Sequence, residues 1–531
     1  MSAPQSQLSQ NTKTENEWTV MVFFAGDPHL SPSMTAQLKA LKDAGFQDQT
    51  TVLVHYDPNE RRVATTTFEI NRKRKADLKQ NGHVGTRIGD GKDPFVRNLI
   101  EDSIPGVPKS ANATEALWHF LMNGLETHPA KHYLIFLIGH GVVVGNDLFL
   151  PDNHPVSGIA LKDLGKILHE FRNRAKRGDG EVDLIGLHSC SMSGIEVAYE
   201  LKGAAKYMLA TEGISFVTSW PYRQLLKKIL NTIDKSNNVN VDDLVSSIQQ
   251  LSLHNSTDFM FSGLSADVCL CSLDSNKIDE LNTPMQSLTK ALKAGLNSPR
   301  GLELITLAHL KAQSYFEETY TDLYDFCLCL ERQCDTADPI QKALTVACRA
   351  MREKLEESPN NVIVQADFFG PLFQYSHGLS IFYPWAEPLE DDPQDQDDTM
   401  LGRYQKYQFT EALGDDSWLS FLKDYFSKTL RKSREVEEGW VQPSRNGSNK
   451  ASITDAIVGV AGNGNGGGEG LAVLPDKPSG SLDKPSGSLG GCNCSIKNYP
   501  REFSIKSPRA AKEYNEDGTV TAPTRPAPAT R

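Results

Sequence analysis

Two apolar runs that end in reactive side chains constrain the fold of this chain most strongly. Residues 133–138 form an uninterrupted apolar run that stops at a Gly-His-Gly sequence around His140. Residues 182–187 form a second, largely apolar run, which leads within three residues to Cys190. Runs of this length, rich in Ile, Leu and Val, predict strands buried on both faces of a parallel sheet. Because parallel strands bring their carboxyl ends to one edge, we expect His140 and Cys190 to lie close together.

A histidine at one strand end and a cysteine at the next suit catalysis by a thiol nucleophile. The thiolate is the attacking species, and a neighbouring imidazole supplies the base that generates it. The Ser-Met-Ser-Gly turn after Cys190 leads into a predicted short helix, whose dipole favours a thiolate. An alternative is that His140, His188 and Cys190 are three ligands of a zinc ion in a metal-dependent hydrolase. No acidic helper at metalloenzyme spacing accompanies them, so we expect no metal.

Composition excludes several classes of protein. The 531 residues carry a net charge of −12, which argues against binding to nucleic acid through bulk positive charge. No apolar stretch approaches the roughly 20 residues of a membrane-spanning helix, and the first residues lack the pattern of a signal peptide. Nine cysteines, an odd number, do not indicate a disulfide framework. We therefore expect a cytoplasmic protein that does not bind membranes.

Alternating strand and helix patterns predict an α/β sandwich with a mostly parallel sheet over residues 17–222. Residues 223–434 are mainly helical in pattern, with late strands. Residues 1–16 are polar, and residues 435–531 contain a Gly-rich segment and two copies of the heptapeptide DKPSGSL, so both ends are predicted to be disordered tails. Within the first domain, residues 172–180 have the composition of an exposed basic loop.

Five segments, occurring in the same order, resemble the clostripain-like cysteine peptidases, which are relatives of caspases and gingipains. They are residues 18–27, 138–141, the strand end at Cys190, 320–326 and 377–384. The resemblance covers about residues 17–427. It implies a caspase-like three-layer sandwich followed by a mainly helical extension.

The resemblance also implies roles for particular residues. His140 would carry protons, and Cys190 would form a thioester with a peptide or protein substrate. The backbone amides of Gly141 and Cys190 would hold the oxyanion. No cofactor is implied, although some relatives require calcium. The acidic run 387–398 could hold this ion, but its spacing fits no known calcium-binding loop and favours a solvated loop.

One position departs from the family pattern. The family usually has Asp two residues before the nucleophile, at the floor of the pocket that receives Arg or Lys. Here that residue is His188, which alternation along a strand places on the same face as Cys190. We therefore expect an altered preference at P1, the residue before the cleaved bond, unless Glu212 supplies the missing charge. The other candidates for substrate binding are Ser189, Thr211, Ser219 and Trp220.

A different class of function also fits the sequence. The change at His188 and the long C-terminal tail suit an inactive caspase-like interaction module, in which the tail binds a partner. Labelling of Cys190 by a thiol-reactive probe distinguishes an enzyme from such a module.

Overall fold

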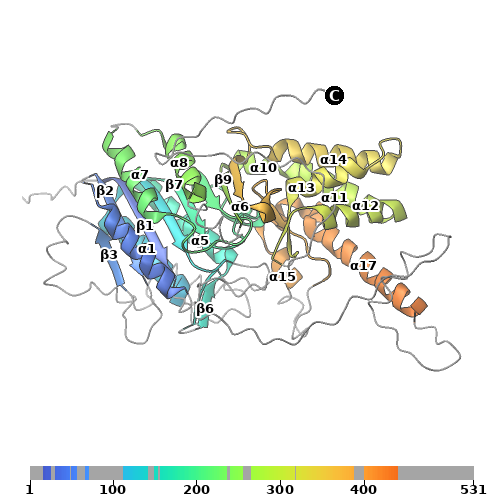
Figure 1. The fold of residues 1–531 in the computed structure, drawn as a ribbon, viewed down its shortest axis with the longest axis horizontal. Coiled ribbons are helices and arrows are strands. Elements are labelled where there is room, and N and C mark those ends of the chain that lie inside the picture. Colours follow the sequence, from blue (N-terminus) through green and yellow to red (C-terminus); the bar gives the residue numbers. More distant parts are fainter. Residues whose placement is uncertain are drawn as a thin grey trace, which may run out of the picture.

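The computed structural model describes residues 16–25, 30–47, 49–56, 66–70, 112–141, 149–153, 156–235, 239–254, 265–316, 318–387 and 400–440. Figure 1 shows a sheet crossed by helices on one side of the molecule and a cluster of helices on the other. Among the described helices, none combines the length and apolar character needed to cross a bilayer.

A large sheet forms the centre of the fold. Within the described residues it has eight strands in the order β12-β9-β8-β7-β4-β1-β2-β3. The five strands β8, β7, β4, β1 and β2 run parallel to one another. At the sides of this group, β3 pairs antiparallel with β2, β9 with β8, and β12 with β9. Their bounds are β1 Asn16–Phe24, β2 Thr50–Tyr56, β3 Thr66–Ile70, β4 Ala130–Ile138, β7 Glu181–His188, β8 Tyr207–Ala210, β9 Ala266–Ser272 and β12 Ile363–Phe369. The predicted mostly parallel α/β sheet is confirmed.

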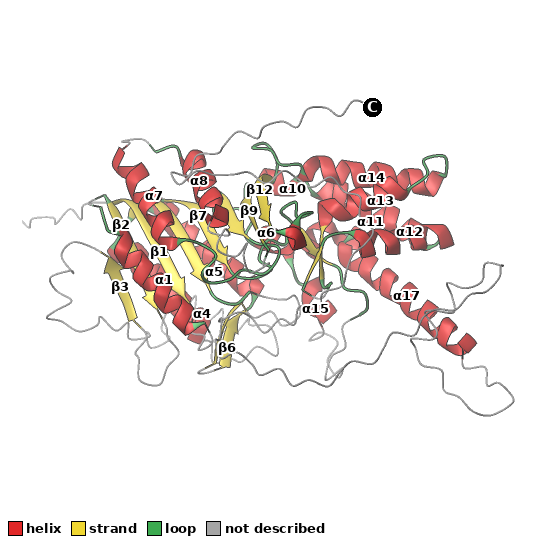
Figure 2. Cartoon of the chain, viewed as in Figure 1, coloured by secondary structure: helices red, strands yellow, loops and turns green. Residues whose placement is uncertain are grey.

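Helices cover both faces of this sheet, giving three layers (Figure 2). One face packs against α1 (Ser31–Ala44), α7 (Tyr222–Lys235) and α8 (Val241–His254). The other packs against α4 (Asn112–Thr127), α5 (Leu161–Arg177) and the short α6 (Ile195–Glu200). The strands between these layers are apolar because both of their faces are buried.

The extension contains further helices and short strands. Its helices are α10 Ser275–Asp279, α11 Asn282–Leu296, α12 Pro299–Lys311, α13 Leu323–Gln333, α14 Pro339–Leu355, α15 Met400–Gln405, α16 Gln408–Leu413 and α17 Trp418–Trp440. Its small strands are β10 Ser314–Tyr315, β11 Tyr320–Asp322 and β13 Ser380–Phe382, which form a separate sheet. Outside the extension, β5 Phe149–Asn153 and β6 Val156–Ile159 of the first domain pair antiparallel with each other.

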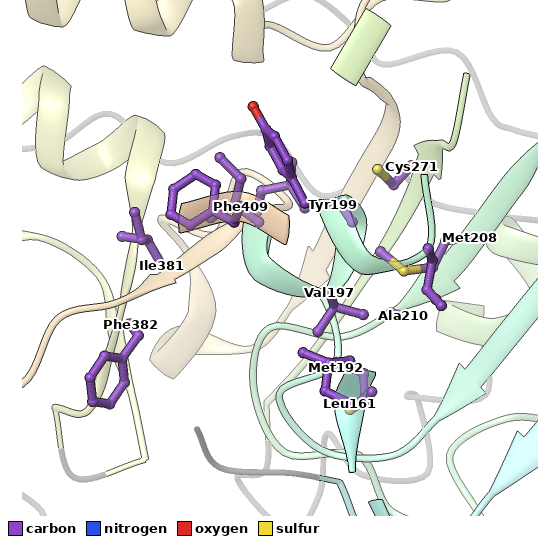
Figure 3. Close-up of a cluster of buried hydrophobic side chains, with 14 of the residues drawn as sticks. Leu161, Met192, Val197, Tyr199, Met208, Ala210, Cys271, Ile381, Phe382 and Phe409 are labelled. Carbon is purple, nitrogen blue, oxygen red and sulfur yellow. The ribbon is translucent and has the colours of Figure 1, made fainter. Parts of the chain in front are cut away.

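The extension and the sheet share one hydrophobic core. Figure 3 shows Met192 and Val197, from the segment after β7, in the same cluster as Phe382 of β13 and Phe409 of α16. Side chains of α6 add polar links: Glu196 accepts hydrogen bonds from the Tyr404 hydroxyl (2.6 Å) and the Phe382 amide (3.0 Å). The segment that follows Cys190 is therefore enclosed by residues far along the chain.

Three predicted boundaries differ from the structure. The sheet continues past residue 222, because β9 and β12 are strands of it. Helix α17 runs to Trp440, past the predicted start of the tail at 435, and residues 441–531 lie outside the described residues. Residues 172–177 belong to α5 rather than to a loop, since basic side chains in the last helical turn interact favourably with the helix dipole.

Candidate active site

The carboxyl ends of β4 and β7 lie next to each other and carry His140 and Cys190. Ile138 is paired with His188, and the Gly139 amide donates a hydrogen bond to the His188 carbonyl (3.4 Å). A Cβ atom placed on Gly141 would lie 1.7 Å from the Cys190 carbonyl oxygen and 2.8 Å from the Cys190 nitrogen. The chain just after His140 therefore packs against the main chain of Cys190, and only glycine allows this approach.

The Cys190 thiol lies beneath a segment that follows β8. The residue is 5% exposed, and its Sγ accepts a hydrogen bond from the Ser215 amide (3.4 Å) and lies 3.6 Å from the Ser215 carbonyl oxygen. The next residue, Ser191, has a φ of 53°, which lies in the left-handed region that residues other than glycine seldom adopt. The turn that presents the thiol is thus held in a conformation that requires support from its surroundings.

His188 is buried, and its two ring nitrogens are engaged by protein groups. Nε2 donates to the Phe216 carbonyl (2.8 Å), and since that oxygen only accepts, Nδ1 accepts from the Tyr222 hydroxyl (3.0 Å). The ring stacks on Trp220 with 4.4 Å between centroids. Burial lowers the pKa of His188 to about 3, so the ring is neutral at ordinary pH.

The neutral, fully engaged His188 ring has two consequences. With a pKa of about 3, the ring is not protonated at moderately low pH and offers no positive charge to an acidic substrate residue. The zinc alternative loses support because one nitrogen carries a proton and the other accepts a hydrogen bond. Within the part of the chain that the structure describes, no three His, Cys, Asp or Glu side chains are grouped as metal ligands.

Glu212 faces the protein interior rather than the surface. Its Oε2 accepts hydrogen bonds from the Gly378 amide (2.9 Å) and the Tyr315 hydroxyl (3.2 Å). Burial, followed by the charges of Asp322 and Asp267, raises the pKa of Glu212 well above its usual value. A buried carboxyl of this kind gives no negative charge to an exposed pocket.

The remaining predicted substrate-binding residues are also buried. Thr211 Oγ1 donates to the Ser189 carbonyl (3.2 Å), and Ser219 Oγ donates to the Phe216 carbonyl (2.7 Å). The structure therefore brings the predicted residues together in two groups beside Cys190. One consists of His188, Ser219 and Trp220, and the other of Ser189, Thr211 and Glu212. Their contact with substrate stays a prediction.

Sequence reasoning missed two residues of this region, Ser215 and Asp267. Ser215 contacts the thiol through its main chain, which no side-chain pattern signals. Asp267 accepts hydrogen bonds from the amides of Glu212 (2.5 Å) and Gly213 (3.0 Å). A carboxylate near the start of an otherwise apolar strand was the available signal, because a buried charge needs dedicated partners.

Comparison with known proteins identifies the family. The family model described as Peptidase_C11, Clostripain family, matches residues 90–411, more than half of the chain. The chain belongs to the clostripain family. It is therefore a clostripain-family cysteine peptidase, a hydrolase. No curated protein matches this clostripain-family chain.

The solved structures that this chain is similar to include C11 proteases. An inactive zymogen C11 protease from Parabacteroides distasonis is 15% identical with a TM-score of 0.48, covering 75% of this chain and 99% of that one. A secreted C11 cysteine protease from Bacteroides thetaiotaomicron is 13% identical with a TM-score of 0.48 and the same coverages. The latter organism's secreted protease in complex with an irreversible peptide inhibitor is 13% identical, with a TM-score of 0.46, covering 76% of this clostripain-family chain and 99% of the other.

Proposed function

We propose that this clostripain-family chain is an endopeptidase in which His140 and Cys190 form the catalytic dyad. The observation that carries the proposal is the contact between Gly141 and the Cys190 main chain, at the adjacent ends of β4 and β7. This contact supports the proposal because it joins the main-chain segments that carry His140 and Cys190, at the edge of the sheet where α/β folds keep their sites. An imidazole and a thiol are the two groups that thiol catalysis requires.

The proposed reaction has two stages. His140 takes the thiol proton, and the Cys190 thiolate attacks the peptide carbonyl carbon, while the amides of Gly141 and Cys190 donate hydrogen bonds to the oxyanion. The C–N bond then breaks, His140 gives its proton to the leaving amine, and a thioester remains on Cys190. Water attacks the thioester with His140 as base, which releases the acid product and restores the thiol.

Covalent labelling tests this proposal against the inactive-module alternative. We expect a set of peptidyl chloromethyl ketones with varied P1 residues to alkylate Cys190, as located by mass spectrometry, and substrate peptide to slow the labelling. His140→Ala should reduce the labelling rate because the thiolate loses its base. Cys271 is the internal control, since burial raises its pKa to about 12. A protein that leaves Cys190 unlabelled with every probe would support the interaction module instead.

The proposed specificity is for uncharged P1 residues. Neither His188, which is neutral, nor Glu212, which is buried against Tyr315 and Gly378, offers a carboxylate to a guanidinium or ammonium group. An unpaired buried charge costs several kcal/mol, which corresponds to roughly a hundredfold or more in rate. Cleavage after Arg or Lys should therefore be slow.

A positional peptide library checks this specificity. We expect uncharged P1 residues to be preferred over Arg and Lys by about a hundredfold in kcat/KM. The preference should be the same at pH 6 and pH 8, because His188 stays neutral at both. His188→Asp should raise the relative rate after Arg or Lys, whereas the matched control Glu212→Gln should leave the profile unchanged. Arg or Lys as the best P1 residue of the wild type, with no change in His188→Asp, would contradict the pocket assignment.

Three further expectations remain proposals. A reducing, cytoplasmic setting rests on the nine cysteines of the sequence, an odd number that does not indicate a disulfide framework. The tail proposed to bind a partner lies beyond residue 440, outside the described residues. The acidic run proposed for calcium lies outside them as well, except for Glu387.

A further inference from the structure

Asp267 lies near the beginning of β9, which runs antiparallel to β8. This direction brings the start of β9 to the edge of the sheet where the parallel strands end and where Cys190 lies. The Asp267 side chain is buried, and its two oxygens accept hydrogen bonds from different amides. Oδ2 accepts from the Glu212 amide (2.5 Å), and Oδ1 accepts from the Gly213 amide (3.0 Å). One carboxylate therefore fixes two successive peptide groups.

The segment that Asp267 fixes, residues 211–213, holds the turn that carries Cys190. The Gly213 carbonyl accepts the Ser191 amide (3.1 Å), and the Glu212 carbonyl accepts the Ser191 hydroxyl (3.3 Å). The Thr211 carbonyl accepts the Ser193 amide (2.9 Å). Thr211 Oγ1 also donates to Ser189, so the bonds lie on both sides of the nucleophile. They hold Ser191 at its positive φ, a conformation that residues other than glycine seldom adopt without such support.

Asp267 and residues 211–213 pack closely against each other. A Cβ atom on Gly213 would lie 2.9 Å from Asp267 Oδ1 and 2.4 Å from Phe373 Cζ. Two amide donors aimed at one side chain need an acceptor at both positions, which a carboxylate provides. An asparagine in the same place would turn an NH₂ group toward one of the amides.

We propose that Asp267 is a positioning residue for the nucleophile, which sets the geometry of Cys190 through residues 211–213. The inference rests on the proposed role of Cys190 and adds a residue from β9, far along the chain from the dyad. A residue that only stabilises the fold would lower the melting temperature without changing kcat in the folded protein. A positioning residue lowers kcat with little change in KM, because the attack geometry is affected and the peptide contacts are not.

The test compares Asp267→Asn with Asp183→Asn, in the full chain, at pH 8. At this pH Asp267, whose pKa burial raises to about 7, is ionised in the wild type. Asp183 is the matched control because it is equally buried in the same sheet, but it binds His132 (2.7 Å) and Lys206 (2.8 Å) at the opposite end of β7. Three quantities are measured: kcat and KM on one peptide, the rate at which iodoacetamide alkylates Cys190, and the melting temperature.

We expect Asp267→Asn to lower kcat by about 10- to 100-fold, with KM within about twofold and a slower alkylation of Cys190. Asp183→Asn should lower the melting temperature and leave kcat unchanged. A folded Asp267→Asn protein with wild-type kcat and alkylation rate would overturn the proposal, as would an equal loss of kcat in Asp183→Asn.

Two further variants keep the test decisive. If Asp267→Asn does not fold, Thr211→Val carries the test, since it keeps the side-chain shape and removes the hydroxyl that donates to the carbonyls of Ser189 (3.2 Å) and Gly213 (3.3 Å). We expect it to lower kcat by about threefold to tenfold with KM unchanged, and a rise in KM alone would overturn the proposal.

The Cys190→Ala variant separates the two proposals. Activity that survives in this variant refutes the dyad, whereas an inactive Cys190→Ala protein beside a fully active Asp267→Asn protein refutes only the role of Asp267.

Discussion

Replacing Cys190 with alanine should abolish peptide hydrolysis, lowering kcat by roughly 10⁴-fold or more. The physical reason is that alanine has no atom to form the thioester, and His140 alone has no nucleophile to activate. The side chain is small and 5% exposed, so the variant should keep its fold and its circular dichroism spectrum. The measurement is turnover of the best peptide from the library, by wild type and variant at equal concentration.

The matched control for this variant is Cys334→Ala. Cys334 is a half-buried thiol that ends α13 in the extension, far along the chain from the strand ends that carry the dyad. Its replacement should leave kcat within about twofold of the wild type, because surface changes away from a site have small effects. Peptidase activity that persists in Cys190→Ala, or disappears equally in Cys334→Ala, would contradict the assignment of the nucleophile.

Replacing Gly141 with alanine should lower kcat/KM by about a hundredfold or more. The added methyl carbon would lie 1.7 Å from the Cys190 carbonyl oxygen, and the atoms it meets are backbone atoms that cannot rotate away. One of the two strand ends must therefore move, and a misplacement of about 1 Å between catalytic groups costs roughly a hundredfold in rate. The same shift would displace the Gly141 amide from the oxyanion. Steady-state kinetics on the library peptide measures the loss.

Gly178→Ala is the control for this substitution. Gly178 also lies in a turn next to a catalytic strand, but its φ is −104° and an added Cβ would meet only the Ala175 carbonyl oxygen, at 3.6 Å. That is ordinary van der Waals contact, so kcat/KM should be unchanged. Near-normal kinetics in Gly141→Ala would mean that the close approach of the two strand ends is not needed for activity.

The elements with a simple pattern of burial could be predicted from the sequence. The runs at 133–138 and 182–187 became β4 and β7 because strands buried on both faces are apolar throughout. The alternating polar and apolar residues at 66–70 are likewise typical of a strand, and they form β3 at one edge of the sheet.

Strand β12 shows where such patterns fail. It is an edge strand of the sheet, and its polar residues Gln365 and Asp367 interrupt an otherwise apolar run. In the fold their side chains bind Ser246 (2.7 Å) and Gln249 (3.1 Å) of α8, which satisfies them. The partners are more than a hundred residues away in the sequence, so the local pattern does not reveal the strand.

The same distinction applies to the site. By itself the sequence determined which side chains end the two buried strands, and hence the prediction of His140 and Cys190 as neighbours, because parallel strands share an edge. Only the tertiary structure decided the protonation and the hydrogen-bond partners of His188 and Glu212. Tyr222 and Phe216 engage the imidazole, and Tyr315 and Gly378 engage the carboxyl. Charge and hydrogen bonding depend on burial and on partners from distant segments, which chain order does not specify.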